Sequence, residues 1–249
     1  MNPTRALIIL GSGLEDLYNR DIARKFDVKT RYGVARCAEL YFPKVKTIVM
    51  MRHGTKHSVP PHLINYRANI QAAKDLHIGF IIATAAVGSV SRTLSIGTYV
   101  VLDQFLDFTR NRKSTFFLEG YRSFRHTDMT HPYSSDVRQA LIKSLRKNSI
   151  SRYRTRGTYV CTEGPRYETQ AEIRMFQKMG ADVVGMTGVP EVVLANEIGI
   201  PYGTLAYVTN MGAGLQAKVT QEEVETQMLR SSDDMRRIIK STTEEMSSP

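Results

Sequence analysis

The 249-residue sequence has little cysteine, no tryptophan and no apolar run near the length of a membrane span. Secreted disulfide frameworks use more cysteines in shorter chains, whereas only Cys37 and Cys161 occur here, far apart. That content favours a reducing cytoplasm. A membrane-spanning helix needs about 20 apolar residues, and the apolar run at 6–10 is also too short for a signal-peptide core. We therefore expect a cytoplasmic protein with no membrane partner.

Several motifs of common catalytic and nucleotide-binding sites are also missing. Gly11-Ser12-Gly13 lacks the third glycine of a dinucleotide fingerprint, the P-loop lysine motif is absent, and so is Gly-x-Ser-x-Gly. His53, His57 and His62 have a spacing that metal ligands can have. However, no His-Glu-x-x-His motif, cysteine pair or acidic residue accompanies them. The sequence therefore predicts no metal site and no nicotinamide cofactor.

The net charge is +10, from 34 basic and 24 acidic residues. Such a charge is compatible with nucleic acid, an anionic membrane surface or a small anionic substrate. The basic residues are scattered, and neither an RNA-binding motif nor a zinc-knuckle spacing occurs. We therefore expect no nucleic-acid partner, and one phosphate site alone does not explain the charge.

Short apolar runs alternate with segments of helical spacing, which predicts an α/β fold. With 42% apolar and 23% charged residues, the chain is typical of a folded domain with a sizeable core. We expect one domain over 1–249, with a mixed, largely parallel twisted sheet flanked by helices. A polar, irregular stretch covers 109–134, and the tail 242–249 is expected to fray. The expected strands are 6–10, 47–51, 79–84, 98–102, 158–161, 182–185 and 204–208, and the expected helices are 65–76, 135–146, 169–179, 190–197 and 220–241.

Polar or glycine-rich segments follow four of the expected strands: Gly11-Ser12-Gly13, Arg52-His53, 85–89 and Thr209-Asn210. Ligands of open α/β sheets bind at the carboxyl ends of strands. Exposed backbone N–H groups with a hydroxyl suit an oxyanion, and arginine and histidine add donors for phosphate. Each segment also has a purely structural explanation, such as a tight turn, a surface charge or close packing. The prediction of a ligand site therefore depends on the position that the four segments share, at the carboxyl ends of strands.

A further unusual segment is 163–169, which holds two carboxylates, an arginine and a tyrosine between a strand and a helix. The Glu168 carboxylate can accept N–H groups of a flat heterocycle, and the Tyr167 ring can stack on it. The structural alternative is that Glu168 stabilises a helix N-terminus. Asn210 has both a donor and an acceptor, so together these side chains could read a purine from two edges.

The sequence resembles the trimeric nucleoside phosphorylases, which include purine nucleoside phosphorylase and methylthioadenosine phosphorylase. The resemblance covers roughly residues 8–224. The stretches that carry it are Arg52-His53-Gly54 with 65–69, then 84–89 with Asp103-Gln104-Phe105, then 163–169, Gly180-Ala181-Asp182, Met186-Thr187, Val189-Pro190-Glu191 and Thr209-Asn210.

This resemblance implies phosphorolysis of the N-glycosidic bond of a nucleoside, with inorganic phosphate as co-substrate and without a cofactor. It also implies a homotrimer in which His126 reaches the 5′ region of a neighbouring subunit's site. The implied phosphate-binding residues are Ser12, Arg52, His53, Ala85, Ala86 and Thr187. The implied nucleoside-binding residues are Tyr167, Glu168, Met186, Asn210, Gly212 and His126, with Asn210 and Glu168 as the catalytic pair.

Three positions bear on the substrate. Methylthioadenosine phosphorylases typically have a small residue in place of Glu168 and aspartate in place of Asn210. Glu168 accepts an N1–H, which hypoxanthine and guanine have and neutral adenine lacks, so a 6-oxopurine such as that of inosine or guanosine is expected. Gln221 could form a hydrogen bond with a 5′-hydroxyl, which favours inosine and guanosine. The apolar Val224, one turn later, is compatible with a methylthio group, so methylthioinosine and methylthioadenosine remain alternative substrates.

Two readings from other classes also stay open. A basic interaction module could keep such a fold without turnover, since fold does not secure function. A nucleoside hydrolase would release the base without phosphate.

Overall fold

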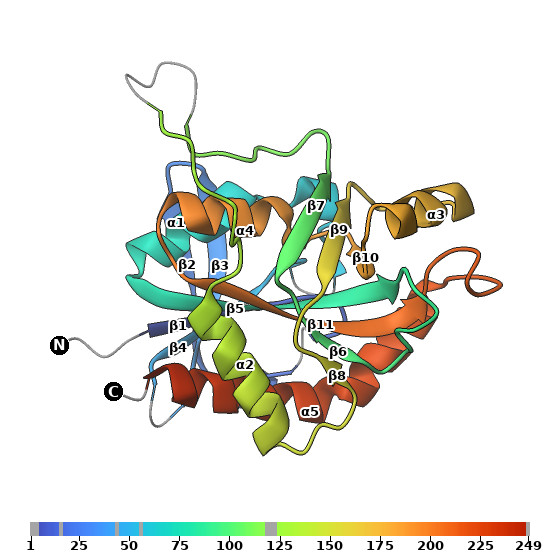
Figure 1. Ribbon diagram of the computed structural model, residues 1–249. Coiled ribbons are helices and arrows are strands. Elements are labelled where there is room, and N and C mark those ends of the chain that lie inside the picture. Colours follow the sequence, from blue (N-terminus) through green and yellow to red (C-terminus); the bar gives the residue numbers. More distant parts are fainter. Residues whose placement is uncertain (1–4, 15–16, 43–44, 55–56, 118–123, 248–249) are drawn as a thin grey trace.

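The computed structural model describes residues 5–14, 17–42, 45–54, 57–117 and 124–247 (Figure 1). They form one sheet of eleven strands in the order β2-β3-β4-β1-β5-β10-β9-β7, with β11 between β5 and β6 and with β8 beside β6. The strands are β1 (Arg5–Leu10), β2 (Ile22–Thr30), β3 (Gly33–Leu40), β4 (Thr47–Met51), β5 (Ile78–Ser89), β6 (Tyr99–Val101), β7 (Gln104–Phe108), β8 (Tyr153–Arg154), β9 (Thr158–Thr162), β10 (Val183–Gly185) and β11 (Tyr202–Met211).

Helices cover both faces of the central strands. The contacts pair α1 with α4 and α2 with α5, and Figure 1 shows these two pairs on opposite sides of the sheet. The helices are α1 (Tyr66–Asp75), α2 (Ser135–Lys147), α3 (Gln170–Lys178), α4 (Gly188–Glu197) and α5 (Gln221–Ser247).

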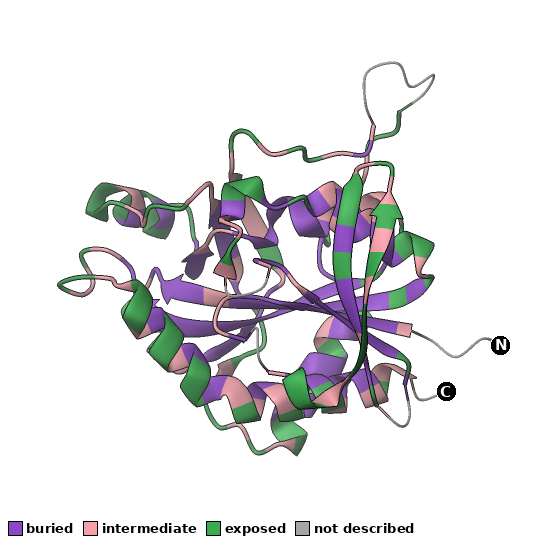
Figure 2. Ribbon diagram, turned by 180° about the vertical axis from the view of Figure 1, so that it is seen from behind, coloured by how far each residue is buried: buried purple, intermediate pink, exposed green. Residues whose placement is uncertain are grey.

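This cover explains why β1 is apolar throughout rather than alternating. Leu7 and Ile9 pack with Ile70 of α1, while Ile8 and Leu10 pack on the other face with residues of α2 and α5 such as Leu141. All four β1 side chains are buried, as in strands that carry helices on both faces. Figure 2 shows the central strands as the most completely buried part of the chain.

The predicted fold class is confirmed. β1 pairs in parallel with β4 and β5, and β5 pairs in parallel with β11, whereas β3 with β4 and β10 with β5 are antiparallel. The sequence prediction missed the β2–β3 hairpin, β7 and β8. It also ended β5 five residues early, although residues 85–89 continue that strand to the site.

Two helix starts follow the capping rules. Asn65 accepts the N–H of Ala68 at 3.0 Å, and Thr169 with Glu172 forms a complete capping box. The Thr220 hydroxyl accepts the Glu223 N–H at 3.2 Å. The Glu223 carboxylate accepts from Gln216 Nε2, so among the described contacts this helix start has one of the two hydrogen bonds of a capping box.

The prediction of a frayed tail from 242 is wrong up to Ser247. Helix α5 continues through Ser247, and Thr242 and Thr243 are buried. Their hydroxyls donate to the carbonyls of Ile238 and Ile239 at 2.8 Å. The end of α5 is held because the helix packs along α2. Residues 248 and 249 lie outside the described part. Despite the length of α5, no helix within the described ranges has the apolar length needed to cross a membrane.

Candidate functional site

A cavity of about 300 Å³ opens at the carboxyl ends of β1, β5 and β11, within the size range of small-molecule sites. All four polar segments expected at strand ends contribute to its wall. The predicted site residues that line it are Ser12, His53, Ala86, Tyr167, Glu168, Met186, Thr187, Asn210, Gln221 and Val224. The cavity is also lined by Pro165 and Thr209 of the predicted segments, and by five residues for which no contact with an organic ligand or phosphate was predicted: His57, Pro60, Pro61, Val184 and Gly185.

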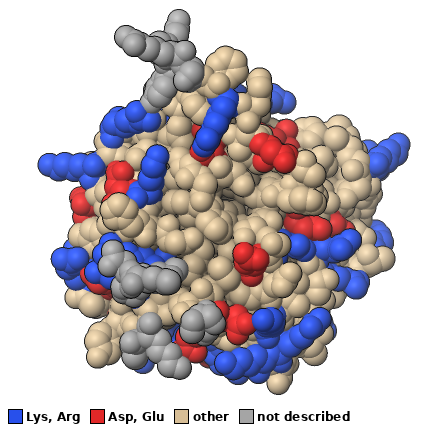
Figure 3. Space-filling model, turned by 60° about the vertical axis from the view of Figure 1, so that its left-hand side comes forward, with Lys and Arg blue, Asp and Glu red and all other residues tan. Residues whose placement is uncertain are grey.

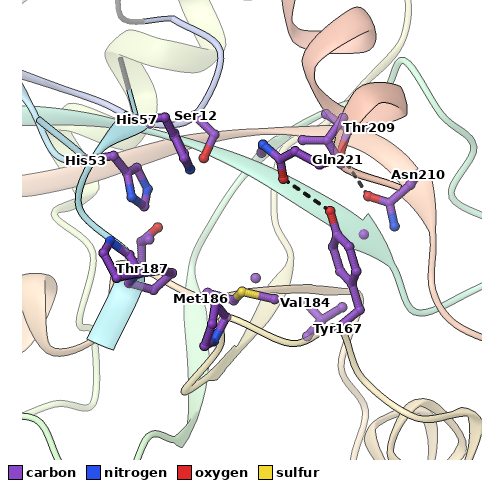
Figure 4. A pocket seen from close by; sticks show the side chains of 18 of the residues that line it. Ser12, His53, His57, Tyr167, Val184, Met186, Thr187, Thr209, Asn210 and Gln221 are labelled. Atoms are coloured by element: carbon purple, nitrogen blue, oxygen red, sulfur yellow. Dashed lines mark hydrogen bonds between the residues drawn. The ribbon is translucent and has the colours of Figure 1, made fainter. Parts of the chain in front are cut away.

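Ser12, His53, His57 and Thr187 gather at one end of this cavity (Figure 4). His53 Nδ1 lies 2.9 Å from the Val59 carbonyl oxygen, so that nitrogen carries the hydrogen of the imidazole ring. The rings of His53 and His57 stack, with centroids 4.3 Å apart. With hydroxyls and imidazoles but no carboxylate among these four residues, this end suits an anion.

His57 reaches the cavity with a φ of 54°, in the left-handed region that few non-glycine residues adopt. From the sequence, the only role weighed for His57 was that of a metal ligand. Across the described residues, no group of three histidine, cysteine, aspartate or glutamate side chains could hold a metal ion.

Arg52 lies behind the wall of the anion end rather than in it. Its side chain is 1% exposed and forms two hydrogen bonds with Glu191, of 2.8 and 2.7 Å, and one of 2.9 Å with the Thr84 carbonyl. Tyr202 donates to the same glutamate at 2.6 Å. Burial lowers the pKa of Arg52, but the interactions with Glu191 and with the neighbouring Tyr202 and Tyr66 together raise it above the usual value, so the guanidinium stays charged.

Gly11 separates this guanidinium from the cavity. A Cβ at Gly11 would lie 2.8 Å from the Thr84 oxygen and 3.2 Å from Arg52 Nη1. Only glycine allows this approach without a shift of the backbone. Ala85 does not line the cavity either, because its side chain belongs to the core cluster on the α1 face. The predicted phosphate contacts of Arg52 and Ala85 are therefore not part of the cavity wall.

Tyr167 and Asn210 lie at the opposite end of the cavity (Figure 4), and Glu168, the residue after Tyr167, also lines the cavity. Thr162 Oγ1 donates to Glu168 Oε1 at 2.8 Å, and the Tyr167 hydroxyl donates to Gln221 Oε1 at 3.4 Å. Burial raises the pKa of the Glu168 carboxyl, while the bond from Thr162 opposes that shift. A desolvated carboxylate beside an aromatic ring is suited to a flat ligand with N–H groups.

Asn210 is turned toward the cavity by an irregularity in β11. The pairing of β11 with β5 shifts register between Val208 and Asn210, as at a β-bulge. The Thr209 hydroxyl donates to Asn210 Oδ1 at 2.9 Å, and Nδ2 donates to the Met211 carbonyl at 3.0 Å. These bonds fix the amide and use one of its two N–H groups. Gly88 makes room for it, since a Cβ there would lie 3.0 Å from Nδ2.

Gln221 and Val224 border the same cavity from the start of α5. Gln221 Nε2 donates to Glu225 Oε1 at 3.0 Å, so its amide bridges Glu225 and Tyr167.

Two predicted residues lie elsewhere in the protomer. Gly212 donates its N–H to the Ser89 carbonyl at 2.8 Å just after β11 and does not line the cavity. His126 borders a separate surface hollow of about 470 Å³ with Phe124, Val193 and Glu197. A contact of His126 with a nucleoside therefore needs a second subunit, and it stays a prediction.

The sequence of 5–244 matches the family model described as the phosphorylase superfamily. The chain is 44% identical over 242 residues to the 6-oxopurine nucleoside phosphorylase of Pyrococcus furiosus, covering 94% of this chain and 90% of the relative. It is 48% identical over 201 residues to a probable S-methyl-5′-thioinosine phosphorylase of Methanosarcina acetivorans, covering 79% and 74%. The structure of methylthioadenosine phosphorylase from Schistosoma mansoni with adenine superposes with a TM-score of 0.91 at 33% identity, covering 96% of this chain and 91% of that one.

Proposed function

The chain belongs to the phosphorylase superfamily, and we propose that it is a 6-oxopurine nucleoside phosphorylase of purine salvage. It cleaves inosine and guanosine with inorganic phosphate to the free base and ribose 1-phosphate. The observation that carries this proposal is the division of one cavity into an anion end and a purine end. Ser12, His53 and Thr187 lie at the first, Tyr167 and Asn210 lie at the second (Figure 4), and Glu168, the residue after Tyr167, also lines the cavity.

At the anion end, phosphate would accept from the Ser12 and Thr187 hydroxyls and would lie beside the His53 imidazole. The buried Arg52 cation behind Gly11 adds a favourable field in a region of low dielectric. Phosphate is already anionic near neutral pH, so the proposal requires neither a general base nor a metal or organic cofactor.

At the purine end, the Glu168 carboxylate would accept N1–H while Tyr167 packs against the ring. As the glycosidic bond breaks, the ribose takes on oxocarbenium character and the purine gains electron density. The second N–H of Asn210 Nδ2 would donate to N7 and stabilise that charge, a preorganised contribution of about 3 kcal/mol for one donor. Met186 lies between the ends and would contact the ribose. Holding the two reactants in line lowers the barrier further.

S-Methyl-5′-thioinosine is the second candidate substrate, with methylthioadenosine less favoured because of Glu168. Pro60, Pro61 and Val224 add apolar surface to the cavity wall, against which a methylthio group would pack. The Methanosarcina acetivorans relative named above supports the same alternative.

We also place the enzyme in the cytoplasm as a homotrimer. The two buried free cysteines suit a reducing compartment. His126 and the exposed Phe124 lie together, with ring centroids 5.4 Å apart, where a neighbouring subunit would cover them. On the face in Figure 3, basic side chains are mixed with acidic ones, which supports a small-molecule enzyme over a nucleic-acid-binding module.

The test is a panel of inosine, guanosine, adenosine, methylthioinosine and methylthioadenosine, each assayed with and without phosphate. We expect phosphate-dependent release of 6-oxopurines and much slower reaction of the 6-aminopurine nucleosides. Release of the base at the same rate with and without phosphate would indicate a hydrolase. No turnover of any nucleoside would indicate a binding module.

A further inference from the structure

The side chain of Arg112 is buried, although the residue lies in the segment 109–134, which the sequence predicts to be polar and irregular. Its side chain is 1% exposed although it follows β7 in an extended loop. The four N–H groups of the two Nη atoms share five oxygens within hydrogen-bond distance, namely the carbonyls of Thr162 (3.1 Å), Glu163 (2.8 Å), Met186 (2.7 Å) and Val189 (2.6 Å) and the Tyr66 hydroxyl (3.0 Å). The Glu163 carboxylate lies 3.6 Å from Nε.

These carbonyls belong to two loops that form different parts of the cavity. Thr162 is the last residue of β9, and Glu163 begins the loop that leads to Tyr167 and Glu168 in the cavity wall. Met186 follows β10 and Val189 is the second residue of α4, so the two residues lie on either side of Thr187. A single guanidinium therefore joins the loop of the purine end to the loop of the anion end.

The chemistry of arginine makes this connection rigid. Its planar group presents five N–H donors in a fixed fork, whereas a lysine ammonium is a single flexible point charge with three. Buried carbonyls without a donor are costly, so the two loops keep their spacing while Arg112 holds them. Thr162 extends the connection, because its carbonyl accepts from Arg112 while its hydroxyl donates to Glu168.

We propose that Arg112 is a positioning residue that sets the distance between the purine end and the anion end of the cavity. The inference rests on the proposed function, because that spacing determines whether phosphate and nucleoside meet in line. A misplacement of about 1 Å costs about 100-fold in rate. Loss of the guanidinium should therefore slow the chemical step much more than it weakens binding of either substrate alone.

The experiment compares Arg112→Lys and Arg112→Ala with wild type and with Lys113→Ala, a change of the exposed neighbouring residue. Single-turnover hypoxanthine formation, hypoxanthine binding and phosphate KM are measured for each. We expect Arg112→Lys to lose about 100-fold in single-turnover rate, with far smaller changes in the other two quantities. Lys113→Ala should match wild type.

Rescue separates positioning from a general structural role. Guanidinium chloride at millimolar concentration should restore part of the Arg112→Ala rate relative to sodium chloride and leave wild type unchanged. If Arg112→Ala does not fold, the Arg112→Lys comparison decides alone. Three results would overturn the inference. The first is a wild-type rate in Arg112→Lys, and the second is a loss of rate that is matched by equal losses in hypoxanthine affinity and in phosphate KM. The third is a folded Arg112→Ala variant that guanidinium does not rescue. A wild-type chain without phosphorolysis would instead refute the proposed function.

Discussion

The Thr162 hydroxyl donates a 2.8 Å hydrogen bond to Glu168 Oε1 in the wall of the cavity. Burial raises the pKa of this carboxyl, and the bond from Thr162 acts in the opposite direction. The bond therefore both orients the carboxylate and favours the ionised form that accepts N1–H from a 6-oxopurine.

Replacing Thr162 with valine should move the acid limb of the pH profile. Glu168 binds the base only when ionised, so kcat/KM for inosine falls as the pH drops through its pKa. Because the hydrogen bond lowers that pKa, its loss should shift the limb to higher pH. Thr162→Ser keeps the hydroxyl and should retain the wild-type profile. Superimposable limbs for the valine variant and wild type would show that Glu168 does not control base binding.

The combined change Glu168→Ser and Asn210→Asp should shift preference toward 6-amino nucleosides. Serine removes the acceptor for N1–H, and a protonated aspartate suits the leaving group of a 6-aminopurine. The ratio of kcat/KM for inosine to that for adenosine should fall relative to wild type, and each single variant provides a control. An unchanged ratio in the double variant would remove these residues from base selection.

The Arg52–Glu191 pair should matter for stability as well as for the anion end. Arg52→Met leaves the Glu191 carboxylate buried without a cationic partner, with only the Tyr202 hydroxyl still donating to it, which costs about 3–5 kcal/mol. Adding Glu191→Met should restore part of that loss, because neither charge then remains buried. Urea unfolding of wild type, both single variants and the double variant, at one protein concentration, measures the coupling. Additive losses would mean that the two side chains do not stabilise each other.

His126→Ala should change discrimination at the 5′ position, since the proposed trimer brings this residue to a neighbouring cavity. We expect the ratio of kcat/KM for inosine to that for methylthioinosine to change, while sedimentation shows an unchanged trimer. A monomeric wild-type protein, or a trimeric variant with the wild-type ratio, would contradict the cross-subunit role.

The sequence predicted most of the parallel core because buried strands such as β1 and β4 are continuous apolar runs. The β2–β3 hairpin was missed because its many exposed charged residues hide the apolar alternation of Phe26 and Val28. The strand-end rule correctly placed Ser12 and Asn210 in one cavity.

What the sequence did not reveal depends on contacts between distant segments. Arg52 is held away from the cavity by Glu191, 139 residues later, and Arg112 joins loops about 50 and 74 residues further along the chain. His57 reaches the cavity through a left-handed backbone conformation. Local periodicity contains no information about any of these three relationships.

The most direct test of the central claim is to follow inosine and inorganic phosphate with the purified protein by phosphorus NMR while measuring hypoxanthine. The account predicts that a ribose 1-phosphate signal grows in equal amount to the hypoxanthine as the phosphate signal declines. Hypoxanthine release with the phosphate signal unchanged would contradict it.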